Sequence, residues 1–242
     1  MMNKAIVMGA SSGIGREVSR LLIARGWCVG VAARRLERLE DLRALAPERV
    51  FTARIDVTDA DAPAQLRQLI QETGGMHLYF HASGIGKQNP ELQEEIELNT
   101  MATNGVGFTR MVGEAFRYFA EHGGGHVAVI SSIAGTKGLG VAPSYSATKA
   151  MQNTYLQSLE QLAKIRHLDI HFTDIRPGFV DTELLGGDSY PLMLKTEDVA
   201  RKAVKAIDHH RHIQVIDWRW RIVTAFWRRI PRWLWRRLPI QN

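Results

Sequence analysis

Two side chains with the spacing of a helical pair could move a proton. Tyr145 and Lys149 are four residues apart in Tyr-Ser-Ala-Thr-Lys, and Ser132 lies thirteen residues before the tyrosine. Residues four apart share one face of a helix. An ammonium beside a phenol favours the phenolate, so the spacing predicts a lowered pKa for Tyr145. Such a phenol could serve in general acid–base catalysis near neutral pH. The alternative is a solvated pair on a helix surface.

A glycine-rich loop opens the chain. Residues 9–15 read Gly-Ala-Ser-Ser-Gly-Ile-Gly and follow a short apolar run. Glycines between a strand and a helix let the backbone turn tightly and approach a pyrophosphate, and the helix N-terminus attracts the anion. The spacing of Gly9, Gly13 and Gly15 is G-x-x-x-G-x-G rather than the commoner G-x-G-x-x-G, and a plain glycine turn is the alternative.

The elements that would position these residues alternate along the chain. Short apolar runs predict strands at 5–8, 27–33, 50–55, 78–81, 126–130, 170–175 and 213–216. Amphipathic stretches predict a helix that starts near Ile14 and stops at Gly26, and further helices at about 35–45, 61–72, 91–121, 144–166 and 196–207. This alternation predicts an α/β fold: one doubly wound, Rossmann-type parallel sheet of about seven strands, covered by helices on both faces.

Composition and charge limit the class of protein. The 242 residues are enough for a buried core, and we predict one Rossmann-fold domain at 1–217 with a tail at 218–242. Residues 1–207 carry 23 Lys+Arg and 23 Asp+Glu, so the net charge of +6 comes from 208–242, with eight Arg and two Asp. The single cysteine, Cys28, fits a reducing compartment, and we expect a cytoplasmic protein without a signal peptide or membrane span.

The end of the second predicted strand indicates which nucleotide binds. It reads Ala-Ala-Arg-Arg at 32–35, without the acidic residue that would bond the ribose 2′-OH of NAD. The guanidiniums of Arg34 and Arg35 suit a 2′-phosphate, so we favour NADP over NAD. Solvated arginines in a first helical turn are the alternative. Asp56, after the third strand, could accept a bond from the adenine amine or could start a turn.

Taken together, these residues resemble the short-chain dehydrogenase/reductase family from about Lys4 to Ile207. The motifs that carry the resemblance are the glycine loop, Asp56-Val57, Ala82-Ser83-Gly84, Asn104, Ser132, Tyr145, Lys149 and Pro177-Gly178. Three positions depart from the family pattern: Met8 replaces a threonine, and His81 and Ser83 stand in a segment that usually reads Asn-Asn-Ala-Gly. We expect altered local hydrogen bonding there and no loss of chemistry.

The resemblance implies a role for each matched residue. Asn104 would hold a water near the lysine, Ser132 would hold the substrate oxygen, Tyr145 would be the acid/base, and Lys149 would bond the nicotinamide ribose. With the residues argued above, the candidate cofactor contacts are Gly9, Ser11, Ser12, Gly13, Ile14, Gly15, Arg34, Arg35, Asp56, Val57, Ala82, Gly84, Tyr145, Lys149, Pro177, Gly178, Val180 and Thr182. No metal is expected.

The implied reaction is hydride transfer between NADP(H) and a carbonyl or alcohol. The segment 183–195, where the family keeps its substrate lid, is fairly apolar and contains Gly186-Gly187, which could flex. A hydrophobic small molecule therefore fits better than a charged sugar. The alternative function is a cofactor-binding scaffold that acts through its tail.

The tail is unusual in composition. It holds five of the six tryptophans, and Ile222, Val223, Phe226, Trp227 and Ile230 form an apolar stripe that Pro231 would end. Packing on the body or within a homodimer or homotetramer and peripheral membrane contact both fit this composition. Nucleic-acid binding is not expected, because no recognition fold accompanies the arginines.

Overall fold

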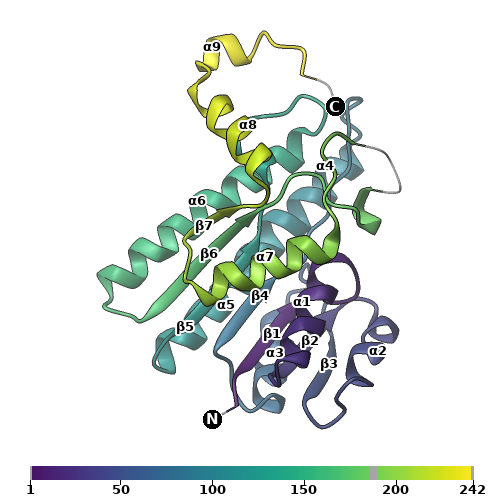
Figure 1. The fold of residues 1–242 in the computed structure, drawn as a ribbon, viewed down its shortest axis with the longest axis vertical. Coiled ribbons are helices and arrows are strands. Elements are labelled where there is room, and N and C mark those ends of the chain that lie inside the picture. The colour runs from purple at the N-terminus through teal and green to yellow at the C-terminus, as the bar shows by residue number, and fades with distance from the viewer. Residues whose placement is uncertain (1, 186–189, 241–242) are drawn as a thin grey trace.

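Within residues 2–185 and 190–240, which the computed structural model describes, seven parallel strands form one sheet in the order β3-β2-β1-β4-β5-β6-β7 (Figure 1). The strands span Lys4–Met8 (β1), Cys28–Ala33 (β2), Val50–Arg54 (β3), Leu78–His81 (β4), Gly125–Ile130 (β5), Ile170–Arg176 (β6) and Ile213–Val215 (β7). The predicted doubly wound parallel sheet is confirmed.

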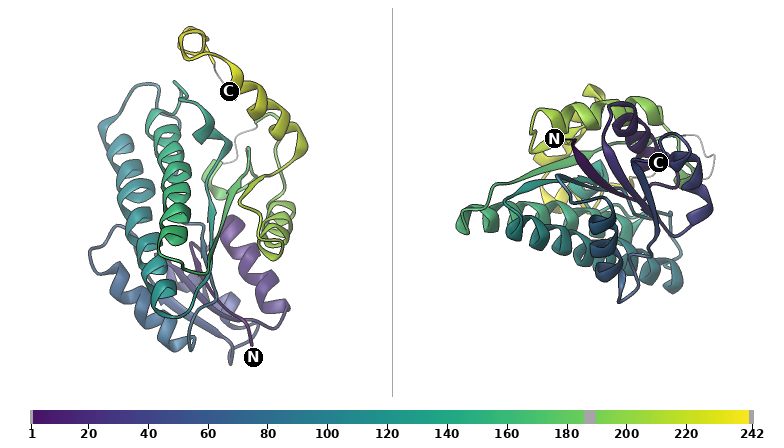
Figure 2. Two further views of the ribbon diagram at one scale, coloured as in Figure 1. Left: turned by 90° about the vertical axis from the view of Figure 1, so that its left-hand side faces the viewer. Right: turned by 90° about the horizontal axis from the view of Figure 1, so that it is seen from below.

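Helices cover both faces of this sheet. They span Gly13–Ala24 (α1), Glu40–Arg43 (α2), Ala62–Glu72 (α3), Glu94–Met101 (α4), Phe108–Glu121 (α5), Pro143–Ile165 (α6), Thr196–Asp208 (α7), Trp218–Arg229 (α8) and Arg232–Trp235 (α9). Helices α1 and α7 lie on one face, and α3, α5 and α6 lie on the other (Figure 2).

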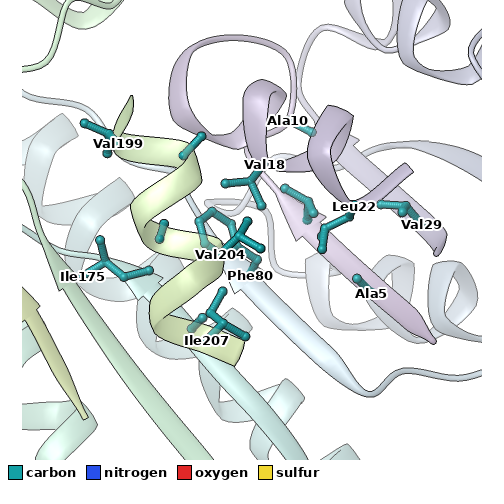
Figure 3. Close-up of a cluster of buried hydrophobic side chains, with 14 of the residues drawn as sticks. Ala5, Ala10, Val18, Leu22, Val29, Phe80, Ile175, Val199, Val204 and Ile207 are labelled. Carbon is teal, nitrogen blue, oxygen red and sulfur yellow. The ribbon is translucent and has the colours of Figure 1, made fainter. Parts of the chain in front are cut away.

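Each face has its own apolar core. On the first face, Val18 and Leu22 of α1 meet Val204 of α7 above the strands (Figure 3). On the second face, Leu66 of α3 and Phe108 of α5 are fully buried. Burying each such side chain contributes about 1.5–3 kcal/mol. A strand covered on both sides needs apolar residues at consecutive positions, which is why the strands appear in the sequence as unbroken apolar runs.

The strand order reverses between β1 and β4. Loops that leave the carboxyl ends of these two strands therefore run to opposite sides and leave a crevice between them. The glycine loop follows β1 at this point, and the segment after His81 follows β4. The sheet topology alone thus places the ligand site at the carboxyl edge, between the two halves of the fold.

The long helix predicted at 91–121 is wrong in one respect. A π-helical segment at Ala102–Gly107 separates α4 from α5. A Cβ at Gly107 would lie only 2.8 Å from a methyl carbon of Val57, so the wider turn fits closely against the loop after β3. The spacing of apolar residues predicts roughly how long a helical segment is. It does not show where a turn is widened by an extra residue, as in a π-helix. The predicted helix at 35–45 is also shorter, with a 3₁₀ turn at Leu36–Arg38 before α2.

The tail forms two helices, α8 and α9, separated at Pro231 as predicted. The apolar stripe predicted from its sequence is wrong as a single face, because Ile222 and Phe226 are exposed whereas Val223 and Trp227 are partly buried. The residues that anchor the tail are Trp220, Thr224 and Trp235, all buried. Residues that flank the expected stripe therefore make the main contacts with the body.

Candidate active site

The glycine loop packs so closely that side chains are excluded from it. Gly9 has φ +90°, and a Cβ there would lie 2.6 Å from the backbone nitrogen of Ser83. A Cβ at Gly15 would lie 2.2 Å from the carbonyl oxygen of Gly9. Ser12 stands at the N-cap of α1 in an extended conformation and makes no side-chain cap. The first N–H groups of α1 thus remain available for an anion.

The carboxylate of Glu183 is held beside this loop by the guanidiniums of Arg35 and Arg38. Arg35 Nη2 lies 3.3 Å from Glu183 Oε2, and Arg38 Nη1 lies 2.5 Å from Glu183 Oε1. Arg35 Nη2 also lies 3.4 Å and 3.5 Å from the hydroxyl oxygens of Ser11 and Ser12. The Glu183 carboxylate is a negatively charged group at the end of β2, where a 2′-phosphate would be recognised. The residues present therefore fit a phosphorylated dinucleotide, although Arg34 is exposed and does not join this cluster.

Arg38 was not among the cofactor residues predicted from the sequence. Its position on the first turn after Arg35 was the available signal, because residues three apart lie on one side of a helical turn. Glu183 was also missed, since it lies 148 residues from Arg35 and no local pattern connects them.

Lys149 and Asn104 belong to one buried hydrogen-bond network. Lys149 Nζ donates to the Ile130 carbonyl at 3.1 Å and to Gln152 Oε1 at 3.0 Å. Gln152 Nε2 in turn donates to the Asn104 carbonyl at 2.8 Å. The π-helical segment contains Asn104, and such segments often occur at functional sites. Gln152 was missed in the sequence, although it lies one helical turn after Lys149.

The Asn104 side chain is bound to the loop after β4. Its Oδ1 accepts from Ile85 N at 2.9 Å, and its Nδ2 donates to the Ile85 carbonyl at 2.6 Å. A Cβ at Gly84 would lie 3.3 Å from Asn104 Oδ1 and 3.7 Å from Lys149 Nζ. Asn104 thus fixes the backbone of this loop against the lysine.

Tyr145 and Ser132 are neighbours in the same site. Ser132 is buried and Tyr145 is partly buried, and the Ser132 hydroxyl lies close enough to the phenol to act on its pKa. The Lys149 ammonium lies 5.7 Å from the centre of the Tyr145 ring. Ser131, the neighbouring hydroxyl, points elsewhere and donates to the buried Asp174 carboxylate, which also accepts from Arg176 Nε at 2.7 Å.

The predicted lowering of the Tyr145 pKa is wrong. Burial raises the pKa of this phenol, and the hydrogen bond with Ser132 only partly opposes the rise. Burial also lowers the pKa of Lys149 to about 8, against the opposing charge of Asp174. The ammonium bonds to Ile130 and Gln152 rather than to the phenol, so desolvation outweighs the attraction expected from the spacing.

The remaining predicted cofactor residues lie in different surroundings. Thr182 packs on it, since a Cβ at Gly13 would lie 3.2 Å from the Thr182 methyl group. Gly178 lies under the tail, where a Cβ would clash with Trp220 Nε1 at 2.2 Å. Asp56 accepts from the backbone and hydroxyl of Thr58, which is the turn weighed as its alternative role. Gly186 and Gly187 of the lid lie outside the described residues.

His81, one of the departures from the family pattern, makes structural contacts. His81 is buried, its Nδ1 lies 2.9 Å from the Tyr79 hydroxyl, and burial lowers its pKa to about 3. Among the described residues, no group of three His, Cys, Asp or Glu side chains is arranged to hold a metal ion. His81 therefore belongs to the packing behind the site.

Comparison with known proteins identifies the family. The sequence model of short chain dehydrogenases matches residues 3–189. An uncharacterised oxidoreductase of Myxococcus xanthus is 34% identical over 211 residues, covering 84% of this chain and 83% of that protein. One of Mycobacterium tuberculosis is 30% identical over 225 residues, covering 89% and 88%.

Solved structures share the fold. A short-chain dehydrogenase from Burkholderia cenocepacia, in complex with NADP, has a TM-score of 0.85 at 20% identity and covers 99% of this chain and 98% of its own. One from Sphingobium yanoikuyae, in complex with NADPH, has a TM-score of 0.81 at 21% identity, covering 96% and 97%. With the family match over most of its length, this chain belongs to the short-chain dehydrogenase/reductase family and is an NAD(P)-dependent oxidoreductase.

Proposed function

We propose that the protein is an NADP(H)-dependent enzyme that interconverts a carbonyl and a primary or secondary alcohol on a hydrophobic small molecule. The observation that carries this proposal is the convergence of Ser132, Tyr145 and Lys149 beside the glycine loop. Turnover of hydrophobic ketones and aldehydes with NADPH, followed by loss of its absorbance, tests the proposal. No turnover across such a screen would favour the alternative, a cofactor-binding scaffold that acts through its tail.

Each residue of the site has a role in the reductive direction. When bound, the nicotinamide supplies the hydride. Ser132 donates a hydrogen bond to the carbonyl oxygen as negative charge develops there. Tyr145 delivers the proton, and its raised pKa keeps the phenol protonated for this step. Lys149 positions the ribose and, with Asn104 and a water, restores the proton to Tyr145.

An apolar surface next to the site supports a hydrophobic substrate. A cavity of about 830 Å³ lies against the loop between Ser132 and Tyr145. Its walls include the apolar side chains of Val141, Trp235 and Leu238. Apolar walls favour ligands that lose little hydration on entry. The lining also includes Arg232 and Arg236, so the cavity would tolerate a polar group at one end.

The NADP preference is proposed from Arg35 and Arg38. A charge-assisted hydrogen bond contributes about 1.5–3 kcal/mol, which is tenfold or more in affinity. We expect Arg35→Gln to raise the Kd of NADPH at least tenfold and to leave that of NADH nearly unchanged. Fluorescence titration of both cofactors measures this. Arg43→Gln, on the exposed side of α2, is the control, and an equal loss for both cofactors would contradict the proposal.

Glu183 should oppose NADPH binding. Its carboxylate occupies both guanidiniums, and it would repel a 2′-phosphate that approached them. The ion pairs are exposed to solvent, which screens them, so each contributes little. We therefore expect Glu183→Gln to tighten NADPH binding by up to about fivefold and to leave NADH binding alone. Weaker NADPH binding in this variant would show that Glu183 supports the site instead.

We also propose a cytoplasmic homo-oligomer, with residues 1–217 as the catalytic domain and 218–242 as its tail. Large apolar side chains are exposed around the π-helical segment, at Leu98, Met101 and Val106. Exposed apolar clusters of this kind often mark subunit interfaces. Light scattering of the purified protein tests for a dimer or tetramer. No helix in the described residues is long and apolar enough to cross a membrane.

A further inference from the structure

The tail helices, residues 218–238, are held firmly by one side. Trp220 packs edge-on against Phe179, with ring centres 5.7 Å apart, and its Nε1 donates to the Leu192 carbonyl at 3.4 Å. Farther along, Trp235 Nε1 donates to the Gly138 carbonyl at 2.8 Å. The tail therefore links the segment after β6 to the loop that precedes α6. These contacts fix the orientation of the tail on the body and leave the side of the tail that faces away from the body unused.

That other side exposes large apolar groups. Trp218, Ile222 and Phe226 are 67%, 61% and 66% exposed, and Trp233 of α9 is 61% exposed. The three residues of α8 are spaced by four, so they form one line along the helix. We call the three aligned side chains of α8 the outer face. Exposed single apolar residues are common on proteins, but an aligned group of three large ones is not.

Arginines surround the outer face. Residues 218–238 contain seven arginines and no acidic residue. Arg221 and Arg229 each follow a member of the line by three positions, so both lie beside it. Arg219 is paired with Asp217 at the start of α8. The outer face thus combines apolar bulk with a positive charge that the rest of the chain does not share.

We propose that the outer face binds the surface of an anionic lipid bilayer, with α8 lying in the plane of the interface. Tryptophans are favoured at the boundary between headgroups and acyl chains, and arginines are attracted to anionic lipid. A helix presented on the surface of the body suits a flat, deformable partner. A symmetric contact between two copies through this face would bring Arg221 and Arg229 of one copy close to the same arginines of the other. This proposal does not depend on the substrate or on turnover.

Co-sedimentation with vesicles tests the proposal. The full chain should bind phosphatidylcholine vesicles that contain phosphatidylglycerol, and it should bind pure phosphatidylcholine far more weakly. In 1 M salt the Debye length falls to about 3 Å, so the difference between the two vesicle types should largely disappear. Binding equal on both vesicle types, or absent at low salt, would overturn the proposal without the use of any variant.

Two double variants separate the electrostatic part of the vesicle affinity from the part due to apolar burial. Arg221→Gln with Arg229→Gln should weaken binding to anionic vesicles about 25-fold, at about fivefold for each charge near the surface. Trp218→Ser with Phe226→Ser should weaken binding about tenfold or more, and the remaining binding should keep its salt dependence. The control pair is Leu45→Ser with Ile165→Ser, two exposed apolar residues outside the tail.

Two further measurements test whether the variants still fold and whether a second copy of the chain, rather than a membrane, covers the outer face. Equal thermal unfolding midpoints would show that the variants fold as the parent does. Light scattering without vesicles should give the same mass for parent and tail variants. If the tail variants alone lost an oligomer, a second copy of the chain would be the occupant and the proposal would be wrong. The proposal would also be wrong if the control pair lost vesicle binding to the same extent.

Discussion

Tyr145→Phe is expected to reduce kcat by about 10²–10⁴-fold, the usual contribution of a positioned general acid. The substitution removes one hydroxyl and leaves the ring, so the buried packing around it should persist. NADPH affinity should stay nearly unchanged, because Lys149, which would bond the ribose, remains in place. Stopped-flow or single-turnover measurements with saturating NADPH and an aldehyde or ketone from the screen would measure the loss in the chemical step.

Tyr155→Phe provides a matched control for this substitution. Tyr155 lies on the same helix, ten residues further on, and its partly buried ring packs against Phe108. It also loses a single hydroxyl, at a position that faces α5 rather than the glycine loop. Turnover of the control should match that of the parent. Substantial residual turnover in Tyr145→Phe at saturating substrate would show that another group supplies the proton.

The parts of the fold predicted correctly depend on local or periodic signals. Strands covered on both faces require runs of apolar residues, and right-handed connections between them allow few arrangements. The glycine loop was predictable because Gly9 and Gly15 stand where the backbone passes within van der Waals distance of itself. Pro231 fixed the division of the tail for a similarly local reason.

The errors arise where distant segments meet. Helical spacing places Lys149 on the same side as Tyr145, but it does not show that Ile130 and Gln152 bind the ammonium. It also does not show how far burial raises the pKa of the phenol. The contact of Glu183 with Arg35 likewise joins segments that are far apart in the chain. Such contacts depend on the packing of the whole domain, which no short motif encodes.

The tail shows the same limit in another form. Apolar periodicity identified a helix with an apolar stripe, which fitted either packing on protein or contact with a membrane. The stripe did not identify the residues that anchor the tail, because Trp220 and Trp235 are buried, partly through hydrogen bonds of their indole N–H groups to backbone carbonyls. Hydrophobicity scales cannot distinguish a tryptophan that packs from one that remains exposed, because the difference lies in the partner surface.

Lys149 should control the pH dependence of the reductive reaction. Burial lowers its pKa to about 8, so the ammonium is present below that pH and is lost as the pH rises through it. The ammonium is the group that would return a proton to Tyr145. We therefore expect kcat/KM, which reports the free enzyme, to be level below pH 8 and to fall about tenfold per unit above it. The raised pKa of Tyr145 should keep the phenol protonated over the same range.

Lys149→Met tests this assignment, because it removes the charge and keeps a side chain of similar length. It should lower kcat, weaken NADPH binding and abolish the decline above pH 8. Lys164→Met is the control, since Lys164 is exposed on the same helix. The loss of two buried hydrogen bonds could also destabilise the fold, by about 1–3 kcal/mol for each acceptor left unpaired. The pH profile separates the two effects, since a purely structural loss would lower activity equally at every pH. A Lys149→Met enzyme with normal NADPH affinity and an unchanged profile would exclude the lysine from both roles.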